Sequence, residues 1–360
     1  MKKKILLGLL VLTLVILPLS AACSSPGSTS APATSAAQTS APQSEVINLK
    51  FAIILPDSPT GCNHSRHLLD YIEEKANGRV KIERYWNGVL GAPPEMLNLI
   101  STRAIDITLL MAPLFTEQLP FHNFPEYQMG GAAKTMDYIN KLNFEIPETA
   151  ALMESELKAN NIKGLNWFYV GEEGIMARTV FSSLDDLKGK KLGTMKPNRA
   201  LSALGINEVS VLESDSYEAL SRGVCDCVNY NLTATVLNKW YEVTKCYMFN
   251  GFFHGGWQTI MNLDTWNSLP ADIQQIIIDA AKDTETYSVE CEKAATADQM
   301  QLLKDKGLVI GQLPAADTEN WFKINYDLNV QDLRDIAAKV GKTADMEVLL
   351  KNVDSLTWSK

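Results

Sequence analysis

The 360-residue sequence has little of what nucleic-acid binding and the commonest hydrolytic reactions require. No extended basic run follows the lysines at positions 2–4, and the formal net charge of −9 suits a polyanion poorly. Gly-x-Ser-x-Gly, His-Glu-x-x-His and phosphate-loop patterns are all missing. His64 and His67 lie one helical turn apart without an evident third metal ligand, so we expect exposed helix residues there. The sequence therefore predicts no nucleic-acid partner, no cofactor and no metal.

Cysteine is also sparse, and its spacing is not that of a small disulfide-stapled protein. Of the six cysteines, Cys23 has a separate role described below, and the odd number that remains cannot all pair within one chain. Cys225 and Cys227 could form a metal or redox pair. Residues i and i+2 of a strand share a face, so two small core residues are the other interpretation. Cys246 could bridge to either, which leaves the disulfide state open.

The first 44 residues read as an export signal and a tether. Lysines at 2–4 precede an apolar run over 5–17, which is short for a hydrocarbon core of about 30 Å. Small residues at 20–22 then precede Cys23. We expect residues 1–22 to be a lipoprotein signal peptide and Cys23 to be lipidated. An ordinary secretory signal is the alternative, because Ser20 stands where leucine is usual.

Residues 24–44 contain only Ser, Thr, Ala, Pro, Gly and Gln. Such a segment cannot bury enough apolar surface to offset the entropy lost on ordering, so it predicts a flexible tether. A lipid at Cys23 and a tether behind it would hold a folded body close to a membrane.

From residue 45 onward, strand and helix patterns alternate. A nearly continuous apolar strand over 49–56 precedes a helix over 63–76, a strand over 80–86, a helix from Pro94 and a strand from about 106. This succession predicts an α/β fold with parallel strands and right-handed crossovers.

The pattern changes after residue 268. Ser268 can cap a helix with Pro270 in its first turn, and apolar residues then repeat at helical spacing as far as Gly307. A helix of about 35 residues would be ~50 Å long, which is too long for one compact domain and could brace two. Two further helices are expected over 319–339 and 345–353.

Four segments in order resemble the extracytoplasmic solute receptors of TRAP transporters, the DctP-type family. They are YIEEKANGRVKIERYWNGVLGAPPEMLNLISTRAIDI, SSLDDLKGKKL, SYEALSRGVCD and WNSLPADIQQIIIDAA. The resemblance implies a periplasmic binding protein-like, type II-like fold: two α/β lobes, a ligand cleft, crossing strands and a long bridging helix. Lobe I would comprise residues 45–167 and 253–285, and lobe II residues 168–252 and 286–360 with the C-terminal helices.

The resemblance also implies a function. The receptor would bind a small organic ligand, an organic acid or an aromatic or neutral analogue, and deliver it to the small and large membrane subunits of a TRAP permease. It would be a monomeric, lipid-anchored, extracytoplasmic protein and no enzyme. Two alternatives remain open: a ligand-sensing domain for a membrane signalling partner, and an exported enzyme.

The sequence departs from the family at its carboxylate clamp. Gly193 stands where the family's Lys-Ile-Arg segment places an arginine, and Met176 stands at the arginine of a Gly-x-Arg pattern. Either a displaced arginine, Arg178 or Arg199, serves instead, or the ligand is not held as a typical carboxylate. Gly193 could also be a strand-end glycine without ligand contact.

Other candidate ligand-binding residues stand at strand ends, where an open α/β sheet places its ligands. Trp167 and Tyr169 fall at the expected first lobe crossing, although both could be aromatic core. The remaining candidates are Asn229, Tyr230 and Asn231 at the end of one strand, and Trp257, with His254, at the second crossing. Aromatic and amide side chains of this kind suit stacking and hydrogen bonding.

Overall fold

The computed structural model describes residues 46–357 except 56, 58–61, 125–126, 196, 198 and 255. The signal peptide, Cys23 and the tether lie outside the described residues. Residues 44–360 form one compact unit, and the following description concerns that unit.

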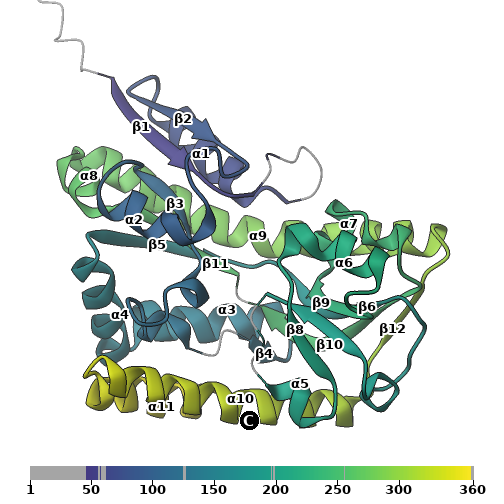
Figure 1. The fold of residues 1–360 in the computed structure, drawn as a ribbon. Coiled ribbons are helices and arrows are strands. Elements are labelled where there is room, and N and C mark those ends of the chain that lie inside the picture. The colour runs from purple at the N-terminus through teal and green to yellow at the C-terminus, as the bar shows by residue number, and fades with distance from the viewer. Residues whose placement is uncertain are drawn as a thin grey trace, which may run out of the picture. The chain divides into compact units, whose positions relative to one another are not determined.

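The first sheet has five strands in the order β2-β1-β3-β11-β5 (Figure 1). β1 is parallel to β2 and β3, as expected from the alternating pattern, but β11 is antiparallel to both β3 and β5. The strands are β1 (Ile47–Ala52), β2 (Val80–Tyr85), β3 (Ile107–Leu110), β5 (Ile162–Phe168) and β11 (Trp257–Asn262).

The second sheet has the order β12-β10-β6-β9-β7-β8, with β4 paired to β10. The chain contributes β4 to the second sheet between β3 and β5, and it enters that sheet again at β12, after α9 (Ala271–Asp305). Its two strand-to-strand crossings run from the first sheet to the second between β5 and β6, and back between β10 and β11. The strands are β4 (Tyr127–Met129), β6 (Glu172–Ala177), β7 (Lys191–Thr194), β8 (Asn207–Ser210), β9 (Cys227–Asn231), β10 (Cys246–His254) and β12 (Val309–Gln312). The two crossing segments therefore connect the sheets, as the resemblance implied.

Helices connect most of these strands. Asn63 starts α1 by accepting a hydrogen bond from the Arg66 N–H at 2.9 Å, which satisfies a donor left unpaired at the helix start. The shorter helices are α1 (His64–Lys75), α2 (Met96–Ser101), α3 (Ala132–Asn140), α4 (Pro147–Ala159), α5 (Ala200–Ala203), α6 (Ser216–Arg222), α7 (Leu232–Leu237) and α8 (Leu263–Ser268). Two long helices, α10 (Ala315–Lys339) and α11 (Thr343–Thr357), end the described chain.

The long bracing helix is confirmed as α9 (Ala271–Asp305), with 35 residues. It packs against α1 and β5 on the side of the first sheet and against α7 and β12 on the side of the second. The expected cap was wrong, because Ser268 ends α8 and its hydroxyl donates to the Thr265 carbonyl at 2.7 Å. Pro270 is the residue that precedes the first turn of α9.

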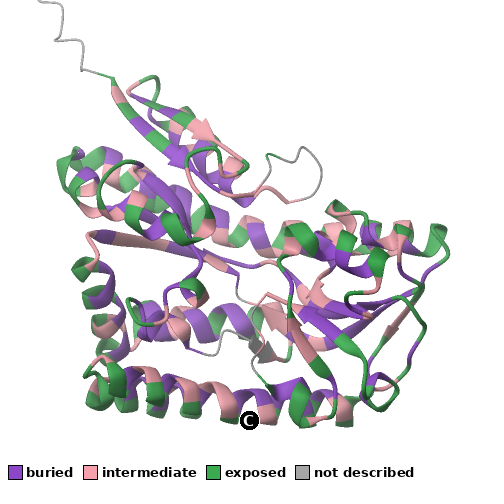
Figure 2. Ribbon diagram, in the orientation of Figure 1, coloured by how far each residue is buried: buried purple, intermediate pink, exposed green. Residues whose placement is uncertain are grey.

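Buried residues, coloured purple in Figure 2, occur along the strands of both sheets. Cys225, Cys227 and Cys246 are buried free thiols, which confirms the core interpretation. Cys225 precedes the first residue of β9, so it packs into a different hydrophobic cluster from Cys227, and the expectation of a shared face was wrong. A disulfide joins Cys62 to Cys291, a pairing that the sequence left open.

Candidate functional site

Four carboxylates of the described chain are buried or half-buried: Glu172 and Glu173 at the start of β6, Glu213 before α6, and Glu292 on α9. Glu172 and Glu173 are consecutive strand residues, so their side chains point to opposite faces of β6. Glu173 and Glu292 are 7% and 4% exposed, and Glu172 and Glu213 are half-buried. No lysine or arginine of the described chain forms an ion pair with any of the four. Burial raises the pKa of Glu172, Glu173 and Glu292 to about 7, and it also raises the pKa of Glu213.

Glu173 has few polar contacts for so buried a carboxylate. It begins the pairing of β6 with β9, opposite Asn231. The Asn229 amide donates to Glu173 Oε2 at 3.3 Å and accepts from the Asn250 amide at 3.1 Å. Burial dominates its raised pKa, while the charge of His254 lowers the pKa and that of Glu213 raises it. Asn229 is thus the one predicted site residue that contacts this carboxylate.

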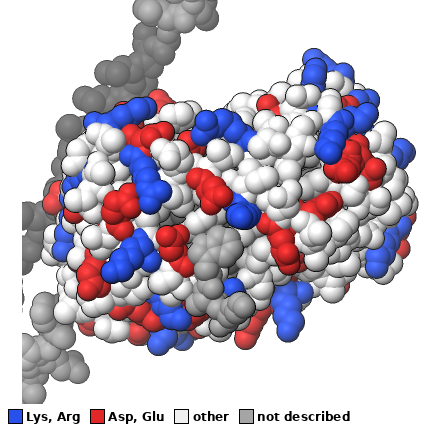
Figure 3. Space-filling model, turned by 90° about the horizontal axis from the view of Figure 1, so that it is seen from below, with Lys and Arg blue, Asp and Glu red and all other residues white. Residues whose placement is uncertain are grey.

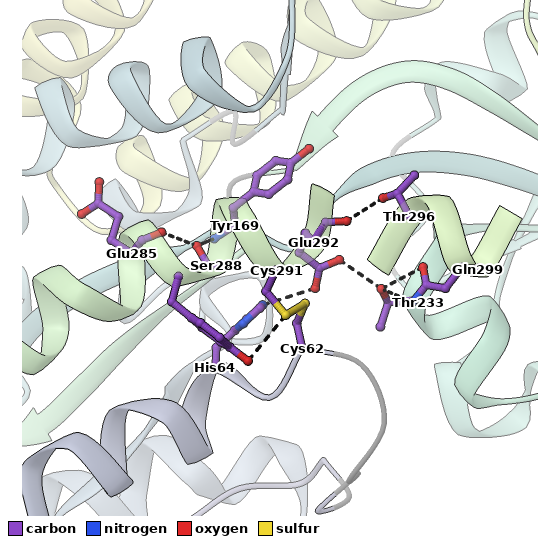
Figure 4. The surroundings of a disulfide bond; sticks show 11 residues. Cys62, His64, Tyr169, Thr233, Glu285, Ser288, Cys291, Glu292, Thr296 and Gln299 are labelled. Atoms are coloured by element: carbon purple, nitrogen blue, oxygen red, sulfur yellow. Dashed lines mark hydrogen bonds and ion pairs between the residues drawn. A yellow bond between two sulfur atoms is a disulfide. The ribbon is translucent and has the colours of Figure 1, made fainter. Parts of the chain in front are cut away.

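Glu292 lies in the middle of α9 and joins three elements (Figure 4). Its Oε1 is 3.4 Å from His64 Nε2 in α1, and its Oε2 accepts from the Thr233 hydroxyl in α7 at 3.0 Å. Burial lowers the pKa of His64 to about 3, so this histidine is neutral. Gly171, with φ +95°, brings the first crossing segment so close that an added Cβ would lie 3.3 Å from Glu292 Oε2.

Tyr169 directly follows β5, in the first segment that connects the sheets. It is 4% exposed, its ring stacks with that of Phe253 at 6.4 Å, and its backbone N–H donates to Ser288 Oγ at 2.9 Å (Figure 4). Among the described residues, its hydroxyl has no hydrogen-bond partner. Burial raises its pKa, and the charges of Glu172, Glu292 and Glu173 raise it further.

The two predicted tryptophans lie in different cores. Trp167 is 1% exposed and meets Phe124 edge-on, with ring centroids 5.8 Å apart. Trp257 is half-buried and packs edge-on against Phe168 at 6.5 Å, in the core of the first sheet. The structure therefore groups Trp167 with Tyr169 and separates both from Trp257.

Tyr230 and Asn231 are held by contacts of their own. The Tyr230 hydroxyl donates to the Val211 carbonyl at 2.9 Å, and its ring meets Trp240 at 5.1 Å. The Asn231 side chain accepts from the Ala234 N–H at 2.8 Å and thereby caps α7. Asn231 therefore stabilises the start of α7, and it also pairs with Glu173 between β9 and β6.

Neither of the two candidate replacement arginines, Arg178 and Arg199, forms an ion pair with Glu173 among the described residues. Arg178 is exposed just beyond the far end of β6, and a strand rises about 3.3 Å per residue, so it lies ~16 Å from Glu173. Arg199 pairs with Asp332 of α10 at 2.7 Å. Gly193 sits on β7, where an added Cβ would lie 3.1 Å from Val211 and 3.2 Å from Val228.

The two neighbouring histidines do not converge on a common point. His64 is 6% exposed, so the expectation of an exposed residue was wrong, and its partner is Glu292. His67 is half-buried, and its Nε2 lies 2.6 Å from Asp283. Within the described ranges, no three His, Cys, Asp or Glu side chains are placed to hold a metal ion.

Two further observations concern the outside of the molecule. On the face shown in Figure 3, acidic and basic side chains are interspersed and no continuous basic patch is visible. In the part of the chain that the structure covers, no helix combines the length and apolar character needed to cross a membrane.

The sequence-family model for bacterial extracellular solute-binding proteins, family 7 (DctP), matches residues 51–328. The C4-dicarboxylate-binding periplasmic protein DctP of Rhodobacter capsulatus is 25% identical over 288 residues, which cover 78% of this chain and 85% of that protein. A solute-binding protein of Sulfitobacter sp. NAS-14.1 is 26% identical over 290 residues, which cover 79% and 85%.

Solved structures share the architecture. A TRAP periplasmic solute-binding protein from Roseobacter denitrificans with bound β-D-glucuronate superposes with a TM-score of 0.72 at 16% identity, covering 87% of this chain and all of that one. The Bordetella pertussis receptor DctP7, which binds pyroglutamic acid, gives a TM-score of 0.69 at 19% identity, with 86% and 100% covered. These likenesses confirm the expected two-lobe α/β fold.

Proposed function

Because the chain belongs to the bacterial extracellular solute-binding proteins of family 7, we propose that it captures a small organic ligand between two lobes and delivers it to the small and large membrane subunits of a TRAP permease. The observation that carries this proposal is the family match over 51–328, which spans both sheets, both crossing segments and α9. The protein would act outside the cytoplasm. We propose a binding function and no catalysis.

We take the lobes as residues 45–167 with 253–285, and 168–252 with 286–360. Sheet membership supports most of this division, because β1, β2, β3 and β11 fall in the first lobe and β6 to β9 and β12 in the second. β4 is the exception, since it falls in the first lobe by residue number and pairs with β10 in the second sheet. α9 continues from one lobe into the other and packs against both sides. Closure would bring the crossing segments and their polar side chains around the ligand.

Anchoring is a separate part of the proposal. A lipid on Cys23 and the Ser/Thr/Ala/Pro tether over 24–44 would hold a monomeric receptor beside its permease at the outer face of the cell membrane. The support is the order of signal, small residues, cysteine and uncharged linker along the sequence.

The ligand site proposed here is the crossing region. Asn229 donates a hydrogen bond to Glu173, and the charge of Glu173 contributes to the raised pKa of Tyr169. Both Asn229 and Tyr169 would contact the ligand directly. Trp167, Tyr230, Asn231 and Trp257 would shape the surrounding walls. Gly193 leaves the family's clamp position without a cation, and the position of Arg178 beyond the far end of β6 makes it a poor replacement.

Native purification tests the receptor function. Mild unfolding followed by mass spectrometry should release a small organic molecule, which calorimetry should return to the emptied protein with one site per chain. Small-angle scattering should then show a smaller radius of gyration with the ligand than without it. A chain that releases no small molecule, binds none and keeps the same scattering profile would contradict a hinged receptor.

A further inference from the structure

An apolar cavity at one edge of the first sheet indicates what kind of side group the ligand carries. We propose that this cavity is a subsite of the ligand cleft, and that the solute is an organic acid with a branched alkyl group that enters it. This inference rests on the proposed receptor function and deepens it, because it names the chemical class of the solute.

The cavity lies at the edge of the sheet from which both crossing segments leave. Leu110 at the end of β3 pairs with Gln258 of β11, and Gln258 pairs with Trp167 of β5. β5 ends one residue after Trp167 and β11 begins one residue before Gln258, so both crossings start beside this row. β1 is parallel to β3, so the chain after Ala52 leaves the sheet at the same edge. Open α/β sheets bind their ligands at such an edge, outside the carboxyl ends of the parallel strands.

The walls of the cavity are almost entirely apolar. They include Ile53 and Ile54 after β1, Met96 of α2, and Leu109, Met111 and Phe115 in or after β3. Thr108 is the polar side chain of the lining, and its hydroxyl already donates to the Ala52 carbonyl at 2.7 Å. Ile54 and the lining residue Pro93 are half-buried, so this side of the cavity lies towards the surface.

The size and the walls of the cavity favour a methyl group over water. Its volume is about 10 Å³, close to the least that holds one water-sized group. A buried water makes about two to four hydrogen bonds, which side chains with one engaged hydroxyl do not supply. A methyl group needs no such partner, and burying one raises affinity roughly fourfold. Met96 and Met111 are unbranched and flexible, so these walls can adjust to a second methyl group.

The alternative is a gap in the packing that no ligand enters. The two interpretations differ in what happens when a larger side chain fills the space. Filling a packing gap should stabilise the protein and leave its affinity for every ligand unchanged. Filling a subsite should instead weaken the binding of acids that carry the branched group.

Probes that share an acid skeleton and differ in one side group test the proposal. One set is malonate, isobutylmalonate and (carbamoylmethyl)malonate. The other is lactate, 2-hydroxy-4-methylpentanoate and 2-hydroxy-3-carbamoylpropanoate. The isobutyl and carbamoylmethyl groups have nearly the same shape and differ in polarity. In calorimetry, we expect the isobutyl member of at least one set to bind at least tenfold more tightly than its two analogues.

Substitutions of Ile54 locate that preference in the cavity. Ile54→Phe should reduce the ratio between the affinities for the isobutyl and the unsubstituted acid by tenfold or more, because the larger side chain occupies the space. Ile54→Ala removes part of the wall and should reduce the same ratio about fivefold, which keeps the test valid if Ile54→Phe does not fold. The matched controls are Ile278→Phe and Ile278→Ala, because Ile278 is 45% exposed on α9 and does not line the cavity. Both should leave the ratio unchanged.

The remaining outcomes are also decisive. An Ile54→Phe variant with a higher melting temperature and an unchanged ratio would show a packing gap and overturn the proposal, as would a carbamoylmethyl probe that binds as tightly as its isobutyl analogue. If no probe binds, the molecule released from the native protein decides, because one without a branched alkyl group overturns the subsite and leaves the receptor function standing. If the wild type neither releases nor binds any small molecule, the proposed receptor function itself fails.

Discussion

Glu292 Oε1 in the middle of α9 lies 3.4 Å from His64 Nε2 at the start of α1. The residues next to this contact are linked covalently, because Cys291 precedes Glu292 and forms a disulfide with Cys62, two positions before His64 (Figure 4). A polar contact and a covalent bond thus fix the same point of the bracing helix to the loop that follows β1.

The disulfide should contribute measurably to stability. It closes a separation of 229 residues, and removing a native disulfide typically costs about 2–5 kcal/mol. Replacing both Cys62 and Cys291 with serine should lower the free energy of unfolding by that order in urea titrations. A reductant should destabilise the wild type and leave the double variant unaffected; equal responses of the two proteins would argue against the bond.

Glu292 should make stability depend on pH. Burial raises its pKa to about 7, so the folded protein binds a proton that the unfolded chain has lost, and stability falls as the pH rises from about 4.5 to 7. Each unit of raised pKa corresponds to about 1.4 kcal/mol. Glu292→Gln should flatten this fall and match or exceed the wild type in melting temperature at pH 8. A variant that is less stable at pH 8 than the wild type would contradict a destabilising effect of ionised Glu292.

Gly256 should tolerate no side chain. It has φ +87°, and an added Cβ would lie 1.9 Å from the Phe168 carbonyl oxygen. Gly307 is a matched control, because it has φ +81° with nothing within 4 Å of an added Cβ. Gly307→Ala should cost about 1–2 kcal/mol from backbone strain alone, and Gly256→Ala clearly more. Equal melting temperatures of the two variants would show that the second crossing segment can move aside.

Removing the Tyr169 hydroxyl should affect binding and spare the fold. Tyr169→Phe keeps the ring and its stacking on Phe253, and it breaks no hydrogen bond found among the described residues. We expect an unchanged melting temperature and a loss of affinity of roughly twofold to tenfold, because a typical hydrogen bond contributes about 0.5–1.5 kcal/mol. Trp167→Ala should instead lower stability by about 3–5 kcal/mol, since Trp167 is 1% exposed. Unaltered affinity in Tyr169→Phe would remove Tyr169 from the site.

Simple carboxylates such as succinate and pyruvate should bind weakly or not at all. Gly193 provides no cation, Arg178 lies just beyond the far end of β6, and Arg199 is paired with Asp332. Calorimetry should therefore show no tight succinate binding, and Arg178→Ala and Arg199→Ala should leave binding of the true ligand unchanged. Tight succinate binding that either substitution abolishes would show that the clamp had moved.

Periodicity and the order of elements predicted the architecture well. The long apolar stripe ending at Gly307 corresponds to α9, and the alternation of strands and helices corresponds to the parallel strands β1 to β3. Local sequence patterns failed to predict the exact residues at which helices and strands begin and end. Ser268 ends one helix instead of capping the next, and Cys225 lies before its strand begins.

The site was predicted less completely, because burial across the crossing segments is not a local property. Glu172 and Glu173 begin β6, whose other residues are uncharged, and Glu292 falls on the buried stripe of α9 together with Thr284 and Ser288. A charge on an apolar stripe is a usable signal. The pairing of Cys62 with Cys291 has none, because any two of the five downstream cysteines could pair as well.

The Cys62–Cys291 bond also constrains when the protein can mature. Its two cysteines are 229 residues apart, so the bond cannot close until that length of chain has emerged. Forming the bond also requires an oxidant, and the bacterial cytoplasm keeps thiols reduced. A chain waiting for export therefore lacks the covalent link between the loop after β1 and α9, and remains easier to unfold and thread through the membrane than the finished protein outside.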